Sequence, residues 1–109
     1  MFIPRSISKQ VLNELLESGK VIVLYGPRQS GKTTLSKLVL DETKLKTLMI
    51  NADQLKYVDI LSSRDLSKLK SLVTGYDILF VDEGQRIPEI GINLKILHDE
   101  IPKLKILVT

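Results

Sequence analysis

Residues 26–33 are Gly26-Pro27-Arg28-Gln29-Ser30-Gly31-Lys32-Thr33, and this stretch decides how the rest of the sequence is interpreted. It matches the pattern G-x-x-x-x-G-K-[ST] at every specified position. The two glycines let the backbone turn so that successive N–H groups point inward, where they can bind phosphate oxygens. The positive end of a following helix adds to that attraction. The sequence therefore predicts a phosphate-binding loop between a buried strand and a helix.

Each side chain that this motif specifies has an expected task. Lys32 would place a positive charge at the β and γ phosphates of a nucleotide, where it would also act in catalysis. The Thr33 hydroxyl is the expected Mg²⁺ ligand, because Mg²⁺ keeps most of its waters and takes only one or two protein oxygens. Thr34 is expected to contact the α phosphate. The nucleotide-binding set is Gly26, Pro27, Arg28, Gln29, Ser30, Gly31, Lys32, Thr33 and Thr34.

A second motif, Ile78-Leu79-Phe80-Val81-Asp82-Glu83, places two carboxylates directly after four apolar residues. Such a run is typical of a strand buried on both faces of a parallel sheet. Asp82 is then expected to hold Mg²⁺ through a water, as in a Walker B motif. Glu83 is expected to orient or deprotonate the water that attacks the γ phosphate. Both acids could instead simply end a strand, but the paired motifs favour the catalytic interpretation.

The nature of the nucleotide and of the reaction is indicated by what accompanies these motifs. The sequence has no N-K-x-D element, by which GTPases recognise guanine, so ATP is the expected nucleotide. Three functions stay open: an ATPase, a nucleotide-binding fragment without turnover, and a kinase that acts on a small molecule or a nucleic acid. Glu83 favours the ATPase, because a second carboxylate suits the activation of water. No acceptor-binding lid supports the kinase.

Apolar periodicity predicts alternating strands and helices around the two motifs. Strands are expected at residues 21–25, 46–50, 78–81 and 105–108, and helices around 11–16, after the phosphate loop, at 64–73 and at 89–100. This alternation favours right-handed crossovers and a mainly parallel sheet that is covered on both faces. The predicted fold class is α/β, a three-layer α/β/α P-loop NTPase, truncated after its fourth strand.

Local residues predict where some of these helices begin and end. Ser8 is a candidate N-cap of the first helix, and Gly19 is a candidate stop. Ser62 and Asp65 have the spacing of a capping box ahead of the third helix. The helix that comes after the phosphate loop is expected from the apolar residues Leu35, Leu38 and Val39.

Composition limits the remaining classes of function. The 109 residues are 43% hydrophobic, which suits one small domain, and the absence of cysteine excludes disulfides and thiolate chemistry. The net charge is +3, but the lysines are dispersed singly, which favours a solvated surface over a nucleic-acid interface. The apolar run 21–25 is far shorter than the roughly 20 residues of a membrane span. We therefore expect a soluble, cytoplasmic protein.

Four stretches together closely resemble the AAA-like ATPases of bacteria and archaea that carry a C-terminal domain of unknown function. These stretches are GPRQSGKTTL, LMINAD, ILFVDEGQRIPE and LKILHDEIPKLKILVT. The resemblance implies ATP and Mg²⁺ as cofactors, phosphate binding by residues 26–34, metal coordination by Thr33 and Asp82, and water activation by Glu83. In that family the acidic pair is followed by I-Q. Gly84 stands where an aliphatic residue is usual, so we expect a looser turn there.

Five further polar residues have less definite roles. Arg28 would contact either the nucleotide or a surface carboxylate, and Gln85 would either sense the γ phosphate or make a loop contact. Asp53 matches an acidic position of the resembled family, with no role assigned. Thr109 is a candidate polar sensor at a strand tip. His98 is expected to be an ordinary surface or boundary residue.

The order of the strands and the end of the sequence give two more expectations. By analogy with related folds, the strand at 105–108 would lie between those at 21–25 and 78–81. A fifth strand would normally cover the free side of 21–25, so an open apolar edge predicts a homo-oligomer or an edge-paired dimer. Since the sequence stops directly after an expected central strand, we expect residues 1–109 to be the incomplete N-terminal part of an ATPase domain.

Overall fold

The computed structural model describes residues 5–17, 21–23 and 32–109. The elements, in chain order, are α1 (Arg5–Glu17), β1 (Ile22–Val23), α2 (Lys32–Thr43), β2 (Thr47–Asn51), α3 (Leu55–Leu61), α4 (Leu66–Val73), β3 (Ile78–Asp82), the 3₁₀ helix η1 (Gly84–Arg86), α5 (Ile90–Glu100) and β4 (Lys105–Val108). Within these ranges, every helix is too short or too polar to cross a lipid bilayer.

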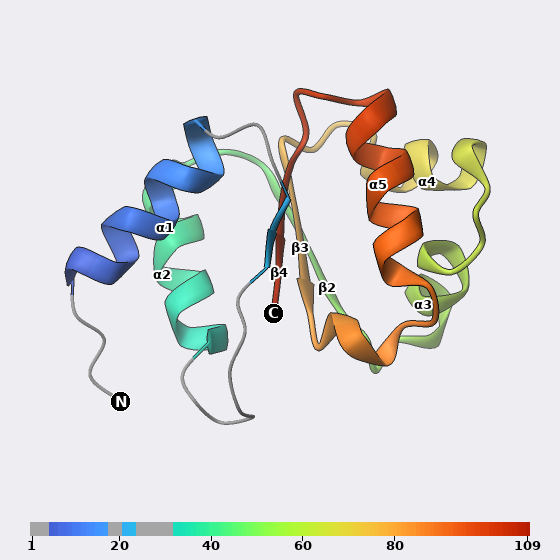
Figure 1. The fold of residues 1–109 in the computed structure, drawn as a ribbon, viewed down its shortest axis with the longest axis horizontal. Coiled ribbons are helices and arrows are strands. Elements are labelled where there is room, and N and C mark those ends of the chain that lie inside the picture. Colours follow the sequence, from blue (N-terminus) through green and yellow to red (C-terminus); the bar gives the residue numbers. More distant parts are fainter. Residues whose placement is uncertain (1–4, 18–20, 24–31) are drawn as a thin grey trace.

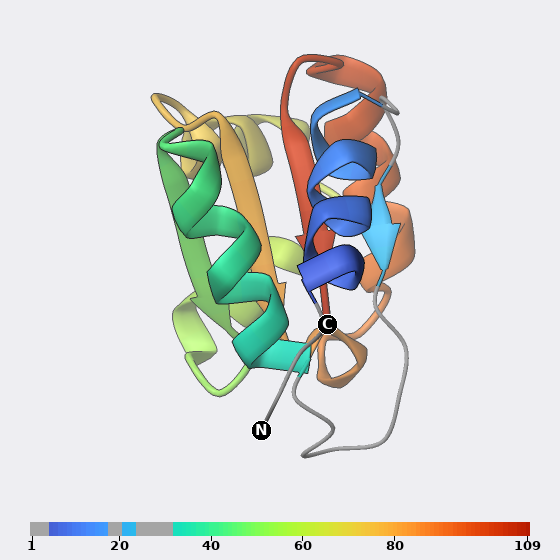
Figure 2. The ribbon, with the colours of Figure 1, turned by 90° about the vertical axis from the view of Figure 1, so that its left-hand side faces the viewer.

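The four strands form one parallel sheet in the order β1-β4-β3-β2. Helices α1 and α2 cover one face of this sheet, and α3, α4 and α5 cover the other (Figure 1). The view from the side shows the same three layers (Figure 2). The α/β class and the position of β4 between β1 and β3 are therefore confirmed.

The two central strands, β3 and β4, form the core of the molecule. Side chains of β3 alternate between the two faces: Leu79 and Val81 pack with the α3–α5 layer, whereas Ile78 and Phe80 pack with the α1–α2 layer. All four side chains are buried. Because both faces are covered, residues 78–81 are all apolar, and the only polar residue of the strand is Asp82 at its end.

Two expected details of the first helices are wrong. Ser8 lies inside α1, which has already begun, so it does not cap this helix. In α2, Val39 is buried as expected, but Leu38 is exposed and Leu40 is buried instead. The side chain of Leu35 lies outside the described residues. The expected stop, Gly19, lies outside the described residues.

Helix α3 was not predicted from the sequence, and its presence explains why the predicted capping box of Ser62 and Asp65 is wrong. Ser62 directly follows α3, and its hydroxyl donates to the carbonyl oxygen of Val58 at 2.7 Å. Ser62 therefore closes α3 and is not part of a capping box. Asp65 alone caps α4, because its carboxylate accepts from the backbone N–H of Lys68 at 3.2 Å. The start of α4 at this aspartate agrees with the usual preference for N-cap residues.

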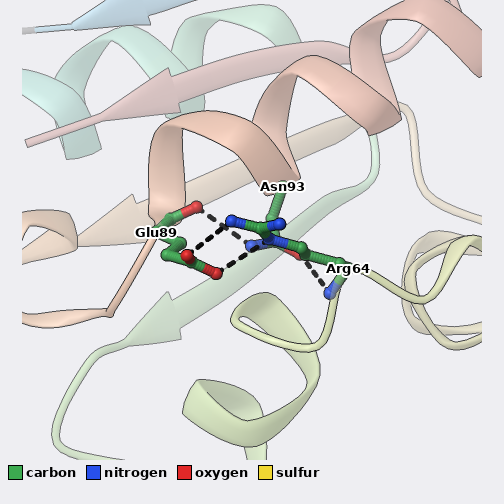
Figure 3. Close-up of polar contacts among 3 residues, drawn as sticks. All are labelled: Arg64, Glu89 and Asn93. Atoms are coloured by element: carbon green, nitrogen blue, oxygen red, sulfur yellow. Dashed lines mark hydrogen bonds and ion pairs between the residues drawn. The ribbon is translucent and has the colours of Figure 1, made fainter.

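A polar clasp of Arg64, Glu89 and Asn93 joins the α3–α4 turn to the start of α5 (Figure 3). The guanidinium of Arg64 contacts both carboxylate oxygens of Glu89, at 2.9 and 2.5 Å. Asn93 is completely buried, and its side-chain oxygen accepts from the backbone N–H of Arg64 at 2.8 Å. Its amide nitrogen donates to the carbonyl oxygen of Glu89 at 3.0 Å. Arg64 and Glu89 both have positive φ, so the clasp holds two backbone positions that are unusual for these residue types.

We predict that the buried amide, not the ion pair, supplies most of the clasp's stability. Asn93→Leu should lower the free energy of unfolding by about 2–3 kcal/mol, because the fully buried amide is lost and two partly buried backbone groups lose their partners. Arg64→Ala should cost about 1 kcal/mol or less, because the side chains of the ion pair are 53% and 47% exposed. Urea denaturation of both variants measures the difference. A larger loss for Arg64→Ala than for Asn93→Leu would contradict this assignment.

Candidate functional site

The carboxyl ends of the strands meet at one edge of the sheet, and polar residues gather there. Asp82 ends β3, pairs in register with Asn51 at the end of β2, and lies beside Thr109, which comes after β4. The first turn of α2 lies at the same edge, next to the end of β4, in both ribbon views (Figures 1 and 2). In open α/β sheets this edge is where ligands bind.

Thr109 orients the carboxylate of Asp82. Its hydroxyl donates to Oδ1 of Asp82 at 2.6 Å, a short distance that is typical of a hydrogen bond to an ionised acceptor. Its backbone N–H donates to the carbonyl oxygen of Val81 at 2.9 Å, which extends the β3–β4 pairing. The Thr109 side chain is therefore fixed next to the acidic end of β3.

Glu83 occupies a backbone conformation that few non-glycine residues adopt. Its φ and ψ are 60° and 40°, in the left-handed region. This conformation turns the chain sharply out of β3 into η1. The carboxylate oxygen Oε2 of Glu83 accepts from the side-chain amide of Gln85 at 2.8 Å. Gln85 thus makes the loop contact that was one of its two expected roles, and strained residues of this kind are often found at functional sites.

Gly84 packs tightly against the end of β4. Its backbone N–H donates to the carbonyl oxygen of Thr109 at 2.9 Å. A Cβ atom built on Gly84 would lie 2.5 Å from Cγ1 of Val108, which is closer than two carbon atoms can approach. The expectation of a looser turn at this position is wrong, because the absence of a side chain is what lets the turn dock on β4.

An ion pair between Asp53 and Arg86 connects the turn after β2 to η1. Both side chains are about half exposed, so the pair contributes little to stability by itself. It gives Asp53 a structural contact at the edge where the site lies. Arg86 was not among the predicted site residues, although its sequence position just after the acidic motif was a signal that could have identified it.

A cavity of about 230 Å³ opens beside Asp82, between α2 and the ends of β2 and β3. It is lined by Lys37, Met49, Ile50, Asn51, Gln54, Phe80 and Asp82. Asn51 and Gln54 use their side-chain oxygens to accept from the backbone N–H groups of Asp53 and Asn51, at 2.9 and 3.3 Å. Neither Asn51 nor Gln54 was predicted as a site residue, because single amides after a strand carry no motif.

Residues 26–31, the predicted phosphate loop, lie outside the described residues. Lys32, Thr33 and Thr34 form the first turn of α2, for which the structure describes the backbone. The predicted context of the motif is nonetheless present on both sides, since β1 precedes it and α2 comes after it. Within residues 5–17, 21–23 and 32–109, no group of three or more His, Cys, Asp or Glu side chains forms a metal-binding cluster.

Comparison with known proteins gives a family match and three relatives. A family model described as an AAA domain matches residues 18–109. Uncharacterized proteins of Mycobacterium bovis and Mycobacterium tuberculosis are each 36% identical over 101 residues, which is 91% of this chain and 21% of theirs. The Holliday junction branch migration complex subunit RuvB of Mycoplasma genitalium is 31% identical over 87 residues, 80% of this chain and 27% of RuvB. The chain thus spans about a quarter or less of these curated relatives.

The packing of Gly84 gives a prediction with an internal control. Gly84→Ala should lower the free energy of unfolding by about 1–3 kcal/mol, because the new methyl group overlaps the short, branched side chain of Val108. Gly91→Ala makes the same change inside α5, where a Cβ would meet no atom within 4 Å. It should raise the free energy of unfolding by about 0.5–1 kcal/mol, because alanine favours helix. Equal effects of the two substitutions in urea denaturation would contradict the close approach of Gly84 and Val108.

Proposed function

Because this chain belongs to the AAA domain family, we propose that it binds ATP with Mg²⁺ through residues 26–34 and that the intact protein hydrolyses ATP. Membership in this family indicates a nucleotide-binding domain of the ATPase type. The observation that carries the finer proposal is the shared edge of the sheet, where the first turn of α2 lies with Asp82, Glu83 and Thr109. Only at such an edge could the two sequence motifs act on one phosphate chain.

The residues at this edge fit a nucleotide with Mg²⁺. Mg²⁺ prefers oxygen ligands and keeps several waters, so one carboxylate and one hydroxyl are enough to hold it. Asp82 offers a carboxylate that Thr109 already orients. The amino end of α2 carries the partial positive charge that favours phosphate. When bound, the ion neutralises charge on the β and γ phosphates.

The chain's own residues have separate tasks in this proposal. The backbone N–H groups of 26–31 bind the phosphates, and Lys32 adds a positive charge next to the γ phosphate. Thr33 and Asp82 hold the ion, directly and through a water. Glu83 accepts a proton from the water that attacks the γ phosphate. Thr34 binds the α phosphate.

Two alternatives share the nucleotide site and differ in the step after binding. The first is binding without turnover by this chain, which covers about a fifth of two of its relatives. The second is phosphoryl transfer to an acceptor, for which the cavity beside Asp82 is the supporting observation. The two acids at the end of β3 favour water as the acceptor, because a second carboxylate serves to activate it. A search for phosphorylated product alongside free phosphate separates these functions.

We also propose that two copies associate through β1. β1 is the outermost strand on one side of the sheet, and among the described strands it pairs only with β4. The side chain of Val23 is 41% exposed there. Edge strands with exposed apolar residues favour pairing with another chain, and lysine at an edge opposes it. Sedimentation velocity should detect a dimer that Val23→Lys disrupts; a monomer at all concentrations would contradict this proposal.

Substitution of the second acid and the loop lysine tests the proposed reaction. Glu83→Gln should preserve the heat of MgATP binding in calorimetry but lower the rate of phosphate release by about 100-fold or more, because the amide cannot accept the proton. Lys32→Ala should abolish measurable binding. Glu89→Gln is the matched control, because Glu89 also has positive φ but lies in the clasp.

Three results bear on this proposal. A wild-type rate of phosphate release by Glu83→Gln would contradict the assignment of Glu83 as the base. The absence of any heat of MgATP binding to the wild-type protein would contradict the proposed function as a whole. Loss of turnover in Glu89→Gln would show that the effect is not specific to Glu83.

A further inference from the structure

The backbone of the turn after β3 is held on both sides of Glu83. Gly84 donates its N–H to the carbonyl oxygen of Thr109 at 2.9 Å, on the β4 side. Arg86 donates its N–H to the carbonyl oxygen of Glu83 at 3.0 Å, on the η1 side. These contacts fix the direction in which the Glu83 side chain leaves the backbone. Its torsions beyond Cβ are set by side-chain contacts instead.

Gln85 supplies such a contact through its amide nitrogen, 2.8 Å from Oε2 of Glu83. An ionised carboxylate only accepts hydrogen bonds, so the amide must present its NH₂ group to it. Residues i and i+2 do not face each other on a regular helix. They meet here because Glu83 is left-handed, with φ of 60°, and this conformation turns the chain back on itself.

We propose that Gln85 is a positioning residue for Glu83. Gln85 holds Oε2 of Glu83 and thereby sets the direction in which Oε1 points. The carboxylate then approaches the attacking water in one orientation. The inference rests on the proposed function, because it gives a task to Gln85 only if Glu83 acts on water. Three features then orient the carboxylate of Glu83 together. They are its positive φ, the packing of Gly84 against β4, and the hydrogen bond from Gln85.

A neutral amide suits this task better than the other side chains of similar size. Lysine or arginine would form an ion pair with Glu83 and weaken its ability to accept a proton. Leucine would occupy similar space but could not donate a hydrogen bond to the carboxylate. A second carboxylate would compete with Glu83 for one proton. Gln85 orients the carboxylate and leaves its charge unchanged.

The kinetic test compares three substitutions in the protein that turns over ATP. Gln85→Leu should lower kcat by about 10- to 100-fold with KM for MgATP unchanged, because misplacement of a reacting group by about 1 Å has effects of this size. Gln85→Glu should lower kcat as well, because a carboxylate has no N–H to donate to Oε2 of Glu83. Gln10→Leu is the control, since Gln10 is exposed on α1. Adding Gln85→Leu to Glu83→Gln should cause no further loss, because the two side chains act as one unit.

A second measurement detects the contact without any turnover. In ¹⁵N NMR spectra, the side-chain amide signals of Gln85 should change strongly on Glu83→Ala, while those of Gln10 stay in place. Absence of turnover in the wild type would defeat the proposed function, and these spectra would still report on the contact. The inference is overturned if the Gln85 signals ignore Glu83→Ala. It is equally overturned if Gln85→Leu and Gln85→Glu retain the wild-type kcat.

Discussion

Thr109 joins the end of β4 to the end of β3 by three hydrogen bonds, and the candidate site depends on this junction. Its N–H donates to Val81, its carbonyl oxygen accepts from Gly84, and its hydroxyl donates to Asp82. The first bond continues the sheet, the second docks the turn that carries Glu83, and the third orients the carboxylate. Both acids are therefore placed by one residue of the neighbouring strand, at the edge where α2 begins.

The turn between β3 and α5 is fixed at both ends. At its start, Gly84 fits against Val108 only because it has no side chain. At its other end, the clasp of Arg64, Glu89 and Asn93 holds the first turn of α5 against the turn between α3 and α4. The positive φ at Glu83 and at Glu89 marks these two ends. The acidic motif thus lies on a short segment with little freedom to move, which suits the precise placement that catalysis needs.

The sequence predicted the central part of this arrangement because buried parallel strands have a simple pattern. The bounds expected for β4 match those observed, and those of β3 differ by one residue, because each strand contains a continuous run of buried apolar residues and has a charged residue only at one end. Helix α3 was missed because it has only seven residues, too few for a clear helical period, although Tyr57, Val58 and Leu61 pack in the core. The contacts of Gln85, Asp53 and Thr109 were also beyond prediction in detail. The contact of Gln85 depends on the left-handed backbone of Glu83, and the contacts of Thr109 depend on the register between β3 and β4. Neither feature can be deduced from the residue type at one position.

The most direct test of the proposed site replaces Mg²⁺ by paramagnetic Mn²⁺ in a complex with ATP. Amide NMR signals close to the bound ion broaden, and those far from it remain sharp. Broadening should be strongest at Asp82, Glu83, Thr109 and the first turn of α2, and it should weaken along each strand toward its amino end, as at Ile78. Broadening centred elsewhere, or none in the folded protein, would contradict the assignment of this edge as the nucleotide site.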